Sequence, residues 1–197
     1  MHPPPTPEER RLRFEEVYAA DHDRILGYVR RRTDNSHDAA DVIAETFLTA
    51  WRRLDDLPRG GEARLWLYGV ARRVLANHHR GERRRSVLAA DLGAELRVEL
   101  AAAVHRPPGH QSSDLPAIAA AFGDLPEGDR ELLALVGWEG LDHGEIATVL
   151  GCSRNAVRIR LYRARRRFAR ELERHDAAFP QSQLIRTPAP ATNGERA

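Results

Sequence analysis

Residues 141–170 have the sequence LDHGEIATVLGCSRNAVRIRLYRARRRFAR, in which a short mixed segment precedes a long cationic one. Gly151 suits a turn between two helices, and Ser153 is a favoured N-cap for the second helix. Between Arg154 and Arg170 there are eight arginines and no acidic residue. This pattern predicts a helix-turn-helix whose second helix is suited to a DNA groove.

The second of these helices has two different faces when successive residues are placed about 100° apart. The face expected to pack against its own domain carries Val157, Leu161, Ala164 and Phe168. The candidate DNA-reading face carries Arg154, Asn155, Arg158, Ile159, Tyr162, Arg163 and Arg166. A solvated amphipathic helix is the simpler alternative, but such a helix normally mixes charges because like charges repel at these spacings. The single-sign run therefore favours contact with nucleic acid.

Length and composition limit the class of protein. The chain has 197 residues, 42% of them hydrophobic and 30% charged, which fits one folded domain or two small ones. All 31 basic residues are arginines, yet the formal net charge is only +2, so the basic character is local. Cys152 is the only cysteine, which excludes an intramolecular disulfide and fits a cytoplasmic setting. No apolar run approaches the roughly 20 residues of a membrane span, so no membrane insertion is expected.

Helical periodicity extends through most of the chain, and no segment alternates as a β-strand does. Three helices are expected in the first half, from Pro7 to about Arg32, from Ala39 to Leu54, and from Glu62 to near Arg85. Two more, at about 116–122 and 127–138, precede the helix-turn-helix. The sequence therefore predicts an all-α fold with two small helical domains joined by a flexible linker.

Composition shifts supply the expected boundaries. We expect a disordered N-terminus over residues 1–10, a first domain over 11–86 and a linker over 87–114. A second domain is expected over 115–175 and a disordered tail over 176–197. The linker assignment depends on the segment 107–114, which is rich in Pro, Gly and Ser, and the tail assignment on its Pro and Ala content.

A second cationic surface is expected on the third helix. Between Arg72 and Arg85 there are six arginines and one glutamate, and Trp66 and Tyr68 lie just before them. Arginine mixed with aromatic side chains suits unstacked, single-stranded bases. Core packing is an equally good explanation for Trp66.

No pattern for catalysis or for a cofactor is present in the sequence. The nine histidines are scattered, and the pair His78-His79 lacks a Cys or carboxylate partner at ligand spacing, so no metal site is expected. There is no Gly-rich phosphate loop and no nucleophile motif. We therefore expect no enzyme, no catalytic residue and no cofactor.

Five runs together resemble the extracytoplasmic-function (ECF) group of bacterial RNA polymerase sigma factors. They are 38–51 (DAADVIAETFLTAW), 64–77 (RLWLYGVARRVLAN), 125–133 (LPEGDRELL), 140–151 (GLDHGEIATVLG) and 156–165 (AVRIRLYRAR). They occur in the family's order and spacing between about residues 11 and 175. The resemblance implies a region-two domain followed by a region-four domain. It also implies a protein that binds core RNA polymerase, directs it to promoters and helps melt the minus-ten region.

The resemblance implies roles for individual residues. The polymerase-binding candidates are Asp38, Asp41, Glu45, Phe47 and Trp51. Core packing explains Phe47 and Trp51 at least as well. The loop 55–64 matches the family's loop that captures a flipped minus-ten base, and the helix after it matches the melting surface. The minus-ten set is then Arg64, Trp66, Tyr68, Arg72, Arg73, Asn77 and Arg80, and the face from Arg154 to Arg166 matches the minus-35 readers.

The alternative function is a helix-turn-helix transcriptional regulator that acts without replacing the sigma subunit. Such a regulator would carry a βα receiver or ligand-binding domain first, whereas this chain has helices with a second basic surface there. Ile159 and Asn155 depart from the small polar residue and the glycine of many relatives, which leaves the promoter preference open. The implied partners are core RNA polymerase and promoter DNA. Relatives are often held by an anti-sigma factor, although no residue here identifies one.

Overall fold

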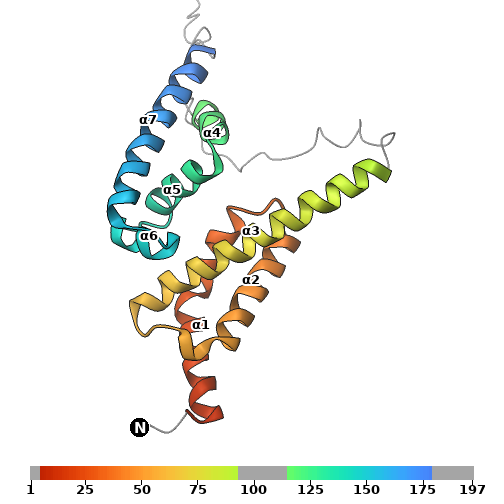
Figure 1. Cartoon of the computed structure of the whole chain (residues 1–197), viewed down its shortest axis with the longest axis vertical. Coiled ribbons are helices and arrows are strands. Elements are labelled where there is room, and N and C mark those ends of the chain that lie inside the picture. Colours follow the sequence, from red (N-terminus) through yellow and green to blue (C-terminus); the bar gives the residue numbers. More distant parts are fainter. Residues whose placement is uncertain (1–4, 93–114, 179–197) are drawn as a thin grey trace, which may run out of the picture.

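The computed structural model describes residues 5–92 and 115–178 (Figure 1). Within these ranges it contains seven α-helices, one short 3-10 helix and no β-strand, which confirms the predicted all-α class. The α-helices are α1 (Pro7–Arg30), α2 (Ser36–Arg52), α3 (Gly61–Leu92), α4 (Leu115–Gly123), α5 (Glu127–Gly137), α6 (His143–Leu150) and α7 (Arg154–Ala178). None of them is long and apolar enough to cross a membrane. Disorder was expected over residues 1–10 and 176–197; of these, 7–10 belong to α1 and 176–178 to α7, whereas 1–4 and 179–197, like most of the expected linker, lie outside the described residues.

Helices α1, α2 and α3 form the first bundle, and each pair of them is in contact. Helix α1 begins with a capping box, in which the Thr6 side chain accepts from the Glu9 backbone N–H and Glu9 accepts from the Thr6 N–H. The Asn35 side chain caps α2 through the Asp38 N–H. The first bundle buries Ile25, Tyr28, Val42 and Leu67 almost completely. These are apolar positions from all three helices.

Helices α4 to α7 form the second bundle, in which α7 packs on α4, α5 and α6. The predicted packing face of α7 is confirmed, because Val157, Leu161 and Ala164 are at most 1% exposed. Phe168 is half-buried and contacts the edge of the Phe122 ring at a centroid distance of 6.4 Å. The opposite face of α7 is therefore left to solvent.

Helix α3 is longer than predicted, because it continues past Arg85 to Leu92. The added segment, SVLAADL, contains no Pro or Gly, and most of its residues are favourable in helices. The arginine cluster before it therefore does not end the helix. The beginning of the predicted linker is helical as a result.

The two bundles pack against each other, which the expectation of tethered domains did not include. Figure 1 shows α6 lying beside the first half of α3, and the two helices are in contact. Gly69 of α3 lies at this contact, where a Cβ would be 3.6 Å from the Val149 carbonyl oxygen of α6, an ordinary van der Waals distance. Buried side chains from both bundles form one continuous apolar cluster.

Candidate nucleic-acid interface

The helix-turn-helix consists of α6, a turn at Gly151 and α7. Gly151 has φ +63°, the left-handed conformation that ends many helices and favours glycine. The Ser153 hydroxyl accepts from the Ala156 N–H at 3.1 Å, so the predicted cap of α7 is confirmed. The turn is thus fixed at both ends by residues that the sequence identified.

Helix α6 has a capping box of its own that the sequence analysis missed. The Asp142 carboxylate accepts from the backbone N–H groups of Glu145 and Gly144, while Glu145 accepts from the Asp142 N–H at 2.9 Å. These backbone hydrogen bonds, that from Glu145 first, hold the pKa of Asp142 below its ordinary value. The pattern of an aspartate followed three residues later by a glutamate could have found this cap.

The exposed face of α7 presents all seven candidate minus-35 residues to solvent. Tyr162 is 61% exposed and Ile159 is 40% exposed, so an aromatic and an aliphatic side chain lie open among the arginines. The Arg158 guanidinium donates to the Asn155 side-chain oxygen at 2.9 Å, and the Arg166 guanidinium lies 5.9 Å from the Tyr162 ring centroid. Cationic, amide and aromatic groups therefore share one open helix face.

The candidate minus-ten residues on α3 divide by exposure. Arg72, Arg73, Asn77 and Arg80 are exposed, and Arg80 donates to the Asn77 side-chain oxygen. Trp66 is half-buried, packs against both apolar clusters of the first bundle, and has the Arg53 guanidinium 5.9 Å from its ring centroid. The core-packing alternative thus accounts for part of the Trp66 surface.

Tyr68 differs from the sequence-based assignment, because it is only 2% exposed. Its ring contacts the Tyr28 ring at a centroid distance of 5.1 Å, and burial raises its pKa, with a smaller contribution from Glu139. A DNA base cannot stack on this ring while the two bundles are packed together. Tyr68 lies next to Gly69, where α3 contacts α6 of the second bundle, and helical periodicity within α3 does not predict a contact of this kind.

The candidate polymerase-binding residues also separate into two groups. Phe47 is 5% exposed and packs against Phe14, which favours the core-packing explanation for it. Trp51 is 39% exposed, and the exposed carboxylates of Asp41 and Glu45 lie on the same helix. Asp38 is more enclosed, and its side chain accepts from the Asn35 amide at 2.7 Å.

Ion pairs cross between the two bundles and were not predicted. Arg32 donates to Glu131 at 2.8 Å and to Glu139 at 3.3 Å, and Arg31 donates to Glu139 at 2.7 Å. The Tyr28 hydroxyl donates to Glu131 at 2.7 Å, and burial, with the nearby Glu131 charge, strongly raises the pKa of Tyr28. The pairing of Arg64 with Glu145, at 3.0 Å, adds a further bridge. One candidate minus-ten residue, Arg64, is therefore occupied by the second bundle.

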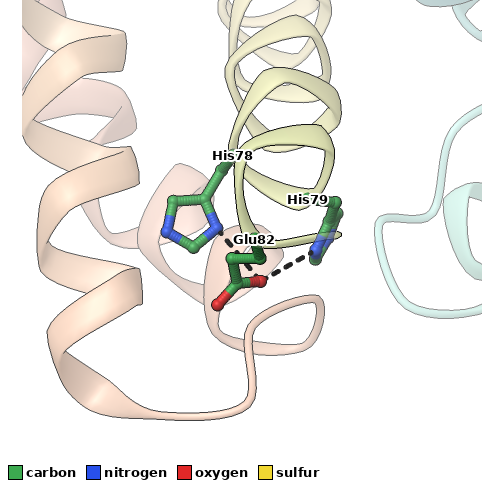
Figure 2. A group of neighbouring side chains, drawn as sticks. All are labelled: His78, His79 and Glu82. Carbon is green, nitrogen blue, oxygen red and sulfur yellow. Dashed lines mark ion pairs between the residues drawn. The ribbon is translucent and has the colours of Figure 1, made fainter. Parts of the chain in front are cut away.

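A cluster of titratable side chains lies on the second half of α3 (Figure 2). The Nδ1 atoms of His78 and His79 lie 3.6 and 3.7 Å from the same Glu82 carboxylate oxygen. The expectation that these histidines lack a carboxylate at ligand spacing was therefore wrong. Glu82 follows them by one helical turn, a spacing that is readable from the sequence.

Comparison with known proteins identifies both bundles. The family model for sigma-70 region 2 matches residues 17–85, and the model for sigma-70 region 4 matches residues 115–168. RNA polymerase sigma factor CnrH of Cupriavidus metallidurans is 33% identical over 144 residues, which cover 69% of this chain and 74% of CnrH. RNA polymerase sigma-H factor of Pseudomonas aeruginosa is 30% identical over 170 residues, which cover 76% of this chain and 81% of that protein.

Solved structures agree with this assignment. The structure of CnrH in complex with the cytosolic domain of CnrY has a TM-score of 0.56 at 27% identity, and the match covers 82% of this chain and 88% of CnrH. The sigma factor RpoE, in complex with the anti-sigma factor NepR from Bartonella quintana, shares the fold with a TM-score of 0.61 at 23% identity, over 81% of this chain and 96% of RpoE. The chain therefore belongs to the sigma-70 family of RNA polymerase sigma factors, in its ECF group.

Proposed function

We propose that this protein is a sigma subunit that binds core RNA polymerase, directs it to specific promoters and helps to melt the minus-ten region. The observation that carries the proposal is that one chain of this family presents two exposed arginine-rich surfaces on two different bundles. A helix-turn-helix regulator needs only the α7 surface. The proposed role includes no catalytic activity of its own, no cofactor and a cytoplasmic location.

The α7 surface is proposed to bind the minus-35 element as duplex DNA. Arginine side chains can bind guanine edges through two hydrogen bonds, and Tyr162 and Ile159 offer apolar contact to a thymine methyl group. The full set is Arg154, Asn155, Arg158, Ile159, Tyr162, Arg163 and Arg166. All of these side chains are already exposed, so binding there requires no rearrangement of the helix-turn-helix.

The α3 surface is proposed to hold the melted minus-ten strand. The side chains of Arg72, Arg73, Asn77 and Arg80 are exposed in this structure, and the half-buried Trp66 precedes them on the same helix. Arg64 is paired with Glu145 of the second bundle, and Tyr68 is buried beside the contact between α3 and α6, so both residues would join this set only after the bundles separate. Separation of the bundles is therefore proposed as a step before promoter melting.

The exposed side of α2 is proposed to bind core polymerase. Asp41 and Glu45 supply negative charge, and Leu48 and Trp51, 40% and 39% exposed, supply apolar area beside it. An apolar centre with charges around it is the usual composition of a protein–protein interface. Asp38 belongs to this surface only at its edge, and Phe47 supports it from the core.

An anti-sigma factor is proposed as a further partner. The structures of RpoE and CnrH that match this fold are those of complexes, RpoE with an anti-sigma factor and CnrH with the cytosolic domain of CnrY. The domain boundaries proposed here remain 11–86 and 115–175, with 87–114 between them.

Run-off transcription with purified core polymerase and selected promoter fragments tests the proposed role. Trp66→Ala combined with Asn77→Ala should spare polymerase binding but reduce strand opening at the minus-ten element, seen by permanganate footprinting. One lost stacking contact amounts to about 1–3 kcal/mol, or roughly tenfold or more in an opening equilibrium. Arg158→Ala should instead weaken binding to the closed duplex promoter.

A pre-melted template distinguishes these two defects. It should rescue the Trp66 and Asn77 variant but not Arg158→Ala. Transcription that starts equally well without the protein, or promoter binding that never depends on core polymerase, would support the helix-turn-helix regulator instead. A loss of helical circular dichroism in the Trp66 variant would show that this residue serves the core alone.

A further inference from the structure

Four side chains converge where α2 begins and α3 passes it. His78, His79 and Glu82 come from α3, with side chains 16%, 36% and 40% exposed, and Asp38 comes from the first turn of α2 and is 18% exposed. The ligand atoms of His78, His79 and Glu82 all lie within 4.8 Å of one another (Figure 2). The cluster is enclosed enough to restrict its side chains and open enough for a small ion to enter.

His78 has a buried ring nitrogen without a hydrogen-bond partner. Among the described residues, its Nδ1 is one of three buried side-chain nitrogen atoms left in this condition. The other ring nitrogen, Nε2, lies 3.4 Å from the Asp38 carboxylate, whose second oxygen accepts from the Asn35 amide. The Nδ1 atom faces Glu82 at 3.6 Å, so His78 lies between two carboxylates, and an ion bound at Nδ1 would leave the Nε2–H to donate to Asp38.

The spacing of the ligand atoms suits a metal ion better than direct hydrogen bonds. The Glu82 oxygen lies 3.6 and 3.7 Å from the Nδ1 atoms of His78 and His79, beyond hydrogen-bond length. Two ligands about 2.0–2.1 Å from a tetrahedral zinc ion are about 3.4 Å apart. Small rotamer shifts would therefore bring all three atoms onto one ion.

We propose that His78, His79 and Glu82 bind a divalent transition-metal ion, with Asp38 as a positioning residue for His78. Two imidazoles and one carboxylate select ions of the zinc, nickel and copper group over magnesium and calcium. Water completes the coordination on the exposed side. The arrangement in which a carboxylate holds the far nitrogen of a ligating histidine is common in metal sites and strengthens the ligand.

The site would connect two surfaces of the protein. Asp38 begins α2, on which the proposed polymerase-binding residues lie, whereas Asn77 and Arg80 of the proposed minus-ten surface flank the histidines on α3. A bound ion would therefore stiffen the contact between α2 and α3. It would also place positive charge beside the surface proposed for the melted strand.

Isothermal titration calorimetry of the full chain, without a histidine tag, with zinc chloride in a non-chelating buffer tests the proposal. We expect one saturable equivalent of zinc, a raised melting temperature, and loss of binding in His78→Gln, His79→Gln and Glu82→Gln. Asp38→Asn should weaken the affinity by about 10–100-fold. His37→Gln is the matched control, since His37 has its own carboxylate neighbour, Asp41, at 3.4 Å but is 84% exposed and lies outside the cluster.

Zinc binding by the cysteine thiol, Cys152, must be distinguished from binding at this site. On a Cys152→Ser background the zinc equivalent should remain, and cobalt bound to the wild type should lack a thiolate charge-transfer band. Because His79 is half-exposed, its glutamine variant should keep the wild-type circular dichroism spectrum and so report on binding alone. Absence of a saturable equivalent, unchanged binding in folded His79→Gln, or loss of binding with Cys152→Ser would each overturn the proposal.

Discussion

Glu139 pairs with two arginines across the contact between the bundles, and its removal should favour their separation. Its side chain is 3% exposed and accepts from Arg31 at 2.7 Å and from Arg32 at 3.3 Å. A hydrogen bond to a charged group contributes about 1.5–3 kcal/mol. Arg31 is 36% exposed, and Arg32 keeps Glu131 as a partner, so both contributions are reduced. We expect Glu139→Ala to weaken the packing of the two bundles by about 2–3 kcal/mol. The ratio of separated to packed molecules should then rise by about 30- to 150-fold.

Thiol labelling measures this ratio even when the open state is rare. On a Cys152→Ser background, Val149→Cys places a thiol at a position of α6 that is 6% exposed and whose backbone contacts α3 at Gly69, so we expect it to react when the bundles separate. Its labelling rate should rise by the same factor when Glu139→Ala is added. Val157→Cys is the control, because that position is buried inside the second bundle and labels only when the bundle unfolds.

The comparison also separates opening from general destabilisation. Glu127→Ala removes an exposed carboxylate from the same bundle and should leave the Val149→Cys labelling rate unchanged. If Glu139→Ala does not accelerate labelling at position 149, the ion pairs do not hold the bundles together. Equal acceleration at positions 149 and 157 would mean that the second bundle itself has been destabilised.

Three further changes test the surfaces and the helix caps. Asp41→Arg with Glu45→Arg should weaken binding to core polymerase in a pull-down but leave the melting temperature nearly unchanged, because exposed charges contribute little to stability. Asp142 has a lowered pKa when folded, so its stabilising effect is present above the ordinary aspartate range, about pH 3.9, and is lost as the pH falls below it. Thermal melts from about pH 7 to about pH 2 should show that Asp142→Asn does not lose this part of its stability in acid. If both proteins respond identically to acid, the Asp142 carboxylate does not stabilise the start of α6. Gly151→Ala should cost about 1–2 kcal/mol in urea unfolding, because alanine is disfavoured at φ +63°.

The sequence was a good guide to helices and to the faces within them. Val157, Leu161 and Ala164 follow the spacing of one helical face, and the structure buries all three. Gly151 and Ser153 marked the turn for conformational reasons that are local to the chain. Such features depend on neighbouring residues, so periodicity and capping preferences are enough to predict them.

The contact between the bundles could not be predicted in the same way. Arg31 and Glu139 are 108 positions apart, and no spacing rule connects an arginine after one helix with a glutamate in a distant loop. The same limit applies to Tyr68, whose position among arginines suggested contact with nucleic acid although its side chain is buried against Tyr28. Glu82 is a different case, because its one-turn spacing from His78 can be read from the sequence, and the expectation that no carboxylate lies at ligand spacing was wrong.

The side chain of Glu145 takes part in two separate arrangements, one through each oxygen. Oε2 accepts from the Asp142 backbone N–H at 2.9 Å and caps α6, while Oε1 accepts from Arg64 of the first bundle at 3.0 Å. A spectroscopic label on this one carboxyl carbon would therefore act as a reporter with three signals. It would distinguish the packed molecule, the separated molecule with an intact helix-turn-helix, and the separated molecule in which the start of α6 has frayed.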